Sequence, residues 1–109
     1  MSTAVRDLIA RGALAIRQQL GTAAEFSRGG EVYWSGLMVW VEVSSGYAVE
    51  LGGAEYSVSG RGTVLEADMD REPLPGDRLR VNGRLLIIVG VFRSPYDSAY
   101  NIEASLLSR

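Results

Sequence analysis

The spacing of apolar side chains changes once along this chain, near Gly21. Before that point, in residues 3–20, apolar side chains recur three, four or seven positions apart, as they do on one face of a helix. Ser2 or Thr3 can cap such a helix, and Gly21 suits the left-handed backbone that often follows a helix end. We therefore predict a helix over 3–20, packed against a sheet or a partner. Its apolar stripe consists of Val5, Leu8, Ile9, Ala13, Ile16 and Leu20.

After Gly21 the period becomes two, which is typical of strands. Short strands are predicted at 23–27 and 63–68, and a long one at 31–43, in which Gly36 is expected to mark a bulge or bend. The long strand has two faces. One carries Val39, Val41 and Val43, and the other carries Met38, Trp40 and Glu42.

The last third of the chain predicts a hairpin followed by one more strand. Leu79 and Val81 point inward, and Asn82-Gly83 is a strong signal for a two-residue type I′ turn. The run "LLIIVGV" at 85–91 is apolar at successive positions, as in a strand covered on both faces. Residues 100–106 alternate between apolar and polar, so we expect the last strand to be half exposed.

A second hairpin is predicted in the middle of the chain, with Gly52-Gly53 as its turn. Gly- and Ser-rich segments at 44–46 and 59–62 resemble flexible joints, so residues 44–62 are predicted to form a hinged arm that is mobile in the free protein. A two-stranded ribbon has little core of its own, so its apolar face must be covered by its own barrel or by a neighbouring subunit. The candidate subunit-interface residues are Tyr47, Val49, Leu51, Tyr56, Val58, Arg61 and Tyr96.

These elements predict a single, mainly β domain over residues 1–109: a small antiparallel β-barrel or sandwich with one N-terminal helix. The chain has no Cys, no His and no Lys, and all eleven of its basic residues are Arg. This composition excludes disulfides, thiol nucleophiles, imidazole bases and Schiff-base chemistry. An enzyme would have to work with carboxylates, Tyr and Arg alone, so we expect no catalytic residues and no cofactor.

Two stretches deserve comparison with ligand-binding motifs. Residues 60–65, "GRGTVL", begin like a dinucleotide-binding loop, but Leu65 replaces the last glycine and no helix follows. Acidic residues alternate from Glu66 to Glu72, but Pro73 stands where a calcium loop needs glycine. We predict no metal site, and interpret the acids as a solvated strand edge or an acidic interface patch.

The chain has two Trp and five Tyr, and aromatic residues with Arg can stack single-stranded bases on a small barrel. A small barrel that binds single-stranded nucleic acid or another ligand is therefore the alternative function. The net charge of −2 opposes nucleic-acid binding, and core packing accounts for most aromatic residues.

The segment Gly76-Asp77-Arg78-Leu79-Arg80-Val81-Asn82-Gly83, followed by the apolar run "RLLIIVGV", is the most recognisable part of the chain. With the order of the other elements, it resembles the head–tail joining proteins of tailed phages, the head completion and tail attachment proteins of the lambda type. The resemblance covers nearly the whole chain in layout and is strongest over residues 72–106.

The resemblance implies a β-sandwich or small barrel without catalytic activity. It implies a ring of subunits between the portal and the tail, with portal or neck proteins and tail proteins as further partners and packaged DNA only nearby. A loop that orders on assembly would correspond to residues 44–62. We accordingly expect a protein without membrane contact, monomeric or weakly associated when isolated, located in the host cytoplasm during assembly and then in the virion.

Overall fold

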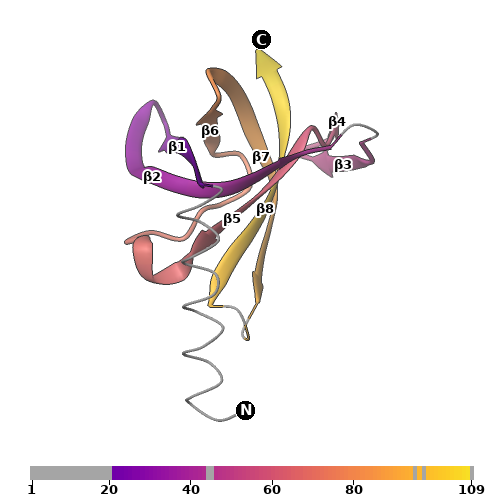
Figure 1. Cartoon of the computed structure of the whole chain (residues 1–109). Coiled ribbons are helices and arrows are strands. Elements are labelled where there is room, and N and C mark those ends of the chain that lie inside the picture. Colours follow the sequence, from indigo (N-terminus) through magenta and orange to yellow (C-terminus); the bar gives the residue numbers. More distant parts are fainter. Residues whose placement is uncertain (1–20, 44–45, 95, 97, 109) are drawn as a thin grey trace.

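The computed structural model describes residues 21–43, 46–94, 96 and 98–108. Six strands form a closed antiparallel barrel in the order β1-β2-β5-β8-β7-β6, and β3 and β4 form a separate two-stranded hairpin (Figure 1). The strands are β1 Gly21–Arg28, β2 Glu31–Glu42, β3 Ala48–Leu51, β4 Ala54–Ser57, β5 Gly60–Leu65, β6 Arg78–Val81, β7 Arg84–Ser94 and β8 Ala99–Ser108, and a short 3-10 helix, η1, spans Glu66–Asp68. The prediction of a mainly β fold is confirmed, and of the two predicted architectures the structure is a barrel. The helix predicted over 3–20 lies outside the described residues.

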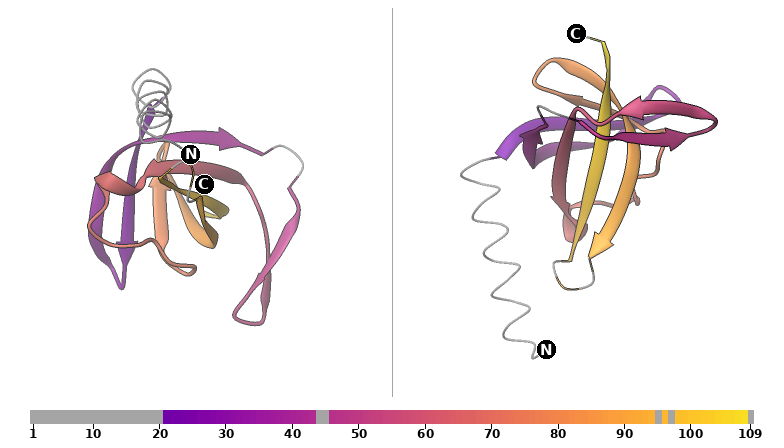
Figure 2. Two further views of the ribbon diagram at one scale, coloured as in Figure 1. Left: turned by 90° about the horizontal axis from the view of Figure 1, so that it is seen from below. Right: turned by 90° about the vertical axis from the view of Figure 1, so that its right-hand side faces the viewer.

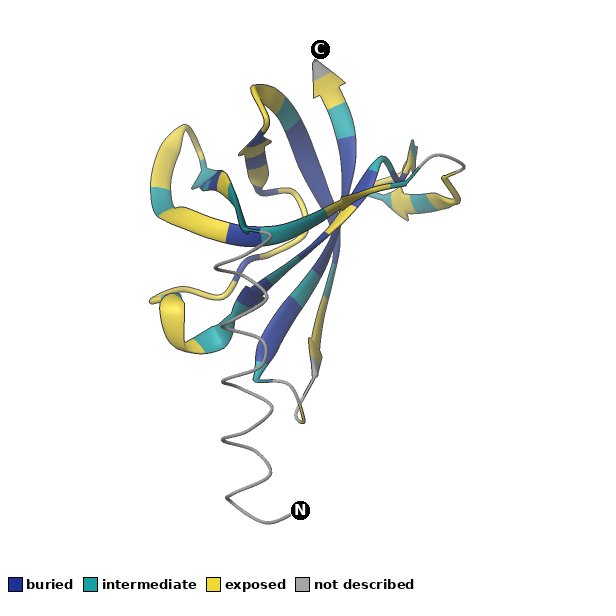
Figure 3. Cartoon of the chain, viewed as in Figure 1, coloured by how far each residue is buried: buried dark blue, intermediate teal, exposed yellow. Residues whose placement is uncertain are grey.

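The barrel interior holds the main hydrophobic core. Alternate residues of each strand point inward, and Figure 3 shows buried positions on all six barrel strands, with the longest buried stretches on β7 and β8. The largest fully buried side chains of this core are Phe26, Met38, Leu79, Leu86, Ile88 and Ile102. The inward direction of Leu79 and Val81, and the outward direction of Arg78 and Arg80, are confirmed.

The glycines of β5 make room for two large side chains of β2. A Cβ at Gly60 would overlap the indole ring of Trp40, and a Cβ at Gly62 would overlap Met38 Cε. Both glycines lie in a strand that pairs with β2 and β8. The expectation of a flexible joint at 59–62 is therefore wrong for 60–62. The strand predicted at 63–68 instead starts at 60 and ends at 65, before η1.

Of the two features expected at Gly36, a bulge or a bend, the bulge is wrong. Gly36 is in regular register opposite Ala24, and it leaves space for the ring of Trp34. The register of the β1–β2 pair shifts instead between Phe26 and Ser27. The register of the β7–β8 pair shifts at two places, between Leu85 and Leu86 and between Ile88 and Gly90, and Val89 is an extra residue at the latter.

Both predicted hairpin turns are confirmed. Asn82 and Gly83 have φ of 53° and 72°, and Gly52 and Gly53 have φ of 60° and 81°. Positive φ at both central positions is the mark of a type I′ turn, which matches the twist of the flanking strands. The Asn82-Gly83 turn joins β6 to β7. On its other side β6 pairs antiparallel with β1, and this β1–β6 pairing closes the barrel.

The β3–β4 hairpin, hereafter the arm, folds back over the outside of its own barrel, beside β7 and β8 (Figures 1 and 2). Its apolar side chains form a second cluster against Ile87 and Val89 of β7. The members from the arm and its flanks are Val43, Val49, Leu51, Tyr56 and Val58. The base of the arm is tied to β8: Ser59 N–H donates to Ala104 O at 2.8 Å, and Leu106 N–H donates to Ser59 Oγ at 2.9 Å.

This position of the arm explains the burial of two neighbouring strands. The prediction of a strand covered on both faces is confirmed for residues 86–90 of β7, because the barrel core lies on one side and the arm on the other. The expectation that β8 is half exposed is wrong at Glu103 and Ser105, which point outward and are nevertheless buried. The mobility expected for residues 44–62 in the free protein stays a prediction.

Candidate functional site

The outer wall of the barrel next to the arm brings together residues from four strands. Arg61 of β5 lies directly opposite Val41 of β2 and Glu103 of β8, and Glu103 in turn lies opposite Gly90 of β7. Because directly opposite residues of an antiparallel sheet point to the same face, these side chains form one row on the outer surface.

A second row runs beside the first, two residues further along β5 and β8. Thr63 lies opposite Val39 and Asn101, and Asn101 lies opposite Phe92. Thr63 Oγ1 donates to Asn101 Oδ1 at 2.9 Å, which ties β5 to β8 at this level.

The two rows and the base of the arm enclose a groove of about 460 Å³, hereafter the Glu103 groove. Its rim includes the exposed ring of Phe92, which is 57% exposed. The lining residues are Tyr47, Arg61, Gly62, Thr63, Phe92, Asn101, Ile102 and Glu103.

Glu103 is the unusual residue of this groove. It is only 8% exposed, and no hydrogen bond or ion pair joins its side chain to another of the described residues. The carboxylate lies over Gly90, where a Cβ would be 2.7 Å from Glu103 Oε1 and 3.3 Å from the Phe92 ring. Burial raises the pKa of Glu103, because removing a carboxylate from water disfavours its charged form.

Arg61 stands beside Glu103 but is held by a different group. Its Nε and Nη2 donate to Tyr47 Oη at 3.0 Å and 2.7 Å, and its guanidinium lies 5.1 Å from the centre of the Tyr47 ring. The backbone of Tyr47 is in turn fixed by Val58 N–H, which donates to Tyr47 O at 2.8 Å. Arg61 and Tyr47 thus form a wall of the groove, and neither of them donates to the Glu103 carboxylate.

A second buried carboxylate, Asp77, lies at a different part of the barrel and is saturated with donors. Arg28 Nε and Nη2 donate to its two oxygens at 2.8 Å each. Tyr33 Oη donates at 2.7 Å and Leu74 N–H at 3.0 Å, both to Oδ2. Burial tends to raise the pKa of Asp77, but the hydrogen bonds from Arg28, Tyr33 and the Leu74 N–H outweigh it and lower that pKa.

The pKa values of the two side chains that donate to Asp77 shift in the opposite direction. Burial, together with donation to Asp77, raises the pKa of the Tyr33 phenol, and the hydrogen bond with Asp77 raises the pKa of Arg28. Gly76 has φ of 96°, and Asp77 N–H donates to Leu74 O at 3.0 Å, so Leu74–Asp77 is a type II turn. Since the Asp77 carboxylate accepts four hydrogen bonds, we interpret this cluster as the contact that holds the Leu74–Asp77 turn against β1 and β2.

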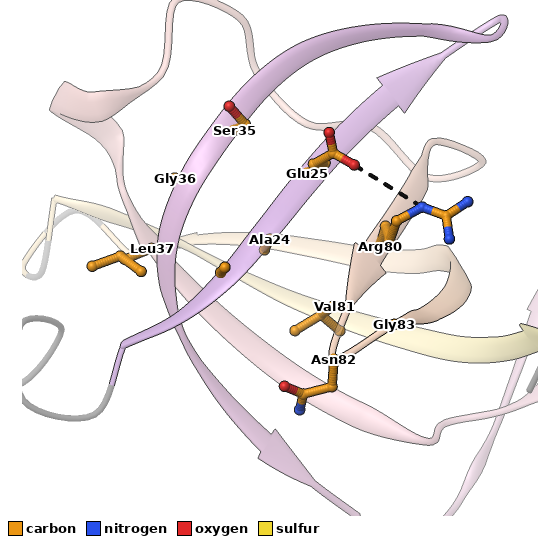
Figure 4. A pocket seen from close by; sticks show the side chains of 10 residues that line it. Ala24, Glu25, Ser35, Gly36, Leu37, Arg80, Val81, Asn82 and Gly83 are labelled. Carbon is orange, nitrogen blue, oxygen red and sulfur yellow. Dashed lines mark ion pairs between the residues drawn. The ribbon is translucent and has the colours of Figure 1, made fainter.

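A second hollow, of about 590 Å³, lies between β1, β2 and the β6–β7 turn (Figure 4). Glu25 and Arg80 point toward each other across it, with 4.0 Å between Glu25 Oε1 and Arg80 Nε, whereas the side chain of Leu37 points away. Much of the lining is small or glycine, including Ala24, Gly36 and Gly83. This hollow holds no buried carboxylate without a donor, so the Glu103 groove is the better candidate site.

The predicted interface residues divide into two groups. Val49, Leu51, Tyr56 and Val58 pack against the chain's own barrel, so the face of the arm that carries them is covered within the molecule. Tyr47 and Arg61 meet in the Glu103 groove, and Tyr96 is 65% exposed in the turn between β7 and β8.

Sequence reasoning missed Gly90, Phe92 and Glu103. Their signal was a glycine inside an apolar strand, which often marks a close approach of another group.

The acidic residues at 66–72 lie on η1 and on the loop that follows it. Glu66 pairs with Arg93, and no group of three or more acidic residues, His or Cys in the described residues is arranged to hold a metal ion. Over the same residues, no helix is long and apolar enough to cross a bilayer.

The chain was also compared with known proteins. It matches no protein-family model and no curated protein.

Proposed function

We propose that this protein is a structural subunit of a tailed phage or prophage, and that it forms a ring at the head–tail junction between the portal and the tail. The observation that carries the proposal is the Glu103 groove, an outer surface in which a buried carboxylate has no donor among the described residues. Such a charge is costly to bury alone, and a protein partner that supplies a donor relieves the cost. The sequence resemblance to head–tail joining proteins supports the same proposal.

The surroundings of the groove have the composition of an interface. Aromatic residues and Arg are enriched where proteins meet, and here Tyr47, Arg61 and Phe92 stand around the buried acid. Val41 extends the surface onto β2, where it is 58% exposed. The strands that build the wall of the Glu103 groove are paired with one another, so we expect a neighbour to dock there on side chains.

The alternative, a barrel that binds single-stranded nucleic acid, has less support. Base stacking needs exposed aromatic rings on a positively charged surface. Phe92 and Tyr96 are exposed, but Trp34 and Trp40 pack against the core, and Trp34 Nε1–H donates to Asp68 O at 2.9 Å. The net charge of −2 is unfavourable as well.

Deleting the gene from the genome that encodes it tests the proposal. We expect DNA-filled heads and free tails that fail to join, seen by electron microscopy of the lysate, and intact virions after the wild-type gene is supplied from a plasmid. Intact virions without the gene would refute the junction role. Retardation of a labelled single strand by the purified protein at low salt would favour the alternative instead.

A further inference from the structure

The Glu103 groove has the chemistry of a site for a guanidinium group. Its carboxylate offers two acceptor oxygens, and the exposed face of Phe92 lies close to the same glycine. A guanidinium can donate to both carboxylate oxygens in one plane and can stack on an aromatic ring. The neighbouring Arg61 does not satisfy this site, since its guanidinium is bonded to Tyr47.

We propose that the occupant of the Glu103 groove is an arginine of a second copy of this chain, Arg78 of strand β6. All eleven basic residues are Arg, so any cationic side chain that a second copy can offer is a guanidinium. The identity of this neighbour rests on the proposed function, because a ring of identical subunits brings one copy against the next. The guanidinium chemistry of the groove does not depend on that role.

The position of Arg78 fits a head-to-tail contact. In the closed strand order, β6 lies three strands away from β5 in either direction, so the two strands are on opposite sides of the barrel. Arg78 points outward and is exposed, and it forms no ion pair with any described residue, whereas its neighbour Arg80 pairs with Glu25. A donor on one side and an acceptor on the other make a heterologous contact, which builds a ring when the rotation between copies closes.

Sedimentation velocity over a concentration series tests the contact between copies. We expect the wild-type chain to form oligomers larger than dimers at high concentration and low salt. Glu103→Gln and Arg78→Gln should each weaken this association about tenfold or more, since a charged hydrogen-bonded pair is lost. Glu55→Gln and Arg71→Gln make the same charge changes at other exposed positions and should associate like wild type.

Mixing the two variants distinguishes head-to-tail contact from other kinds. Arg78→Gln retains the groove and Glu103→Gln retains the arginine, so an equal mixture keeps one functional contact and should stop at dimers. Unchanged association of both single variants, or the absence of association in the wild type at any concentration, would overturn the proposed occupant. Thermal melts confirm that each variant is folded.

Titration of labelled protein with N-acetyl-arginine methylamide tests the groove by itself. We expect NMR shifts at the amides of Gly90, Phe92 and Glu103 in the wild type, and their loss in Glu103→Gln. No shift at these amides would overturn the guanidinium site. If the gene deletion leaves virions intact while arginine still binds, the junction role fails and the site stands. If the deletion blocks joining but arginine does not bind, the site fails and the junction role stands.

Discussion

Asp77 and Glu103 are both acidic side chains buried in the wall of one small barrel, but their surroundings are opposite. Asp77 is 3% exposed and accepts four hydrogen bonds, from Arg28, Tyr33 and the Leu74 N–H. Glu103 is 8% exposed and accepts none from the described residues. Donors lower the pKa of Asp77, and burial without donors raises that of Glu103.

This difference indicates that one carboxylate stabilises the fold and that the other is free to bind a ligand. A buried carboxylate with a full set of donors stabilises the structure around it, and its loss is expensive. A buried carboxylate without donors destabilises the isolated molecule, and a ligand that supplies donors can recover that energy on binding. Asp77 is therefore a structural residue, and Glu103 is the candidate for recognition.

The largest expected effect is that of removing the saturated carboxylate. Asp77→Ala should lower the free energy of unfolding by about 3 kcal/mol, because it leaves the donors of Arg28 and Tyr33 without their acceptor. Urea unfolding followed by Trp fluorescence measures the change, with Asp70→Ala at an exposed position as the matched control. A loss as small as that of the control would break the distinction between the two acids.

A smaller effect is expected from removing one donor of the same cluster. Tyr33→Phe keeps the ring, which packs near Phe26, and deletes the hydroxyl that donates to Asp77. We expect a loss of about 1 kcal/mol in the free energy of unfolding. Tyr96→Phe, at an exposed position, should change it by no more than the error of the same urea titration. An equal effect at both tyrosines would contradict the role given to this hydrogen bond.

Replacing the unpaired carboxylate should have the opposite sign. Glu103→Gln should raise the free energy of unfolding by up to about 1 kcal/mol at pH 7, because a neutral amide is less costly to bury than a charged group. Because the pKa of Glu103 is raised in the folded protein, the full cost of burying its charge applies at pH values above the folded-state pKa. The cost falls as the pH drops and disappears below the unfolded pKa of about 4.3.

The two acids therefore predict opposite responses to acid. The stability difference between Glu103→Gln and wild type should shrink as pH falls from 7 to about 4. The contribution of Asp77, whose pKa is lowered, should stay intact down to its unfolded pKa of about 3.9 and be lost below that. Melting curves at several pH values test both, and a constant advantage of Glu103→Gln at every pH would contradict the buried charge.

The smallest effect on stability is expected from Gly90→Ala. The new methyl group would meet Glu103 Oε1 and the Phe92 ring, both on side chains that can shift outward. We expect a change within about 0.5 kcal/mol, but weaker binding of N-acetyl-arginine methylamide because the carboxylate is displaced. Gly62→Ala is the matched contrast, since its methyl would overlap Met38 in the core and should cost about 2 kcal/mol. Equal destabilisation at both glycines would show that Glu103 is rigidly held.

Much of the barrel could be predicted from local patterns. Asn82-Gly83 and Gly52-Gly53 fixed both turns, and the alternation of Leu79 and Val81 with Arg gave the direction of β6. These features depend on neighbouring residues only, which is why a single sequence reveals them.

The groove and the Asp77 cluster depend on contacts between distant parts of the chain. Asp77 looked like an ordinary turn residue because its partners Arg28 and Tyr33 are 49 and 44 positions away. Gly60 and Gly62 looked like a joint because the side chains that need their space belong to β2. Glu103 lies in a groove with Tyr47, Arg61 and Phe92, which come from distant parts of the chain, so no local pattern specifies its burial.

The closure of the barrel by β1 and β6 has a consequence for biosynthesis. β1 can pair with β2 as soon as both leave the ribosome, but its other edge must wait for β6, whose partner residues lie more than fifty positions later. During that interval the nascent chain carries an open strand edge, which is a template for aggregation. Ordering such a distant pair also makes folding slow for a domain of this size. The synthesis of the Asn82-Gly83 hairpin, which contains β6, thus ends the period in which the open edge of β1 exposes the new chain to aggregation.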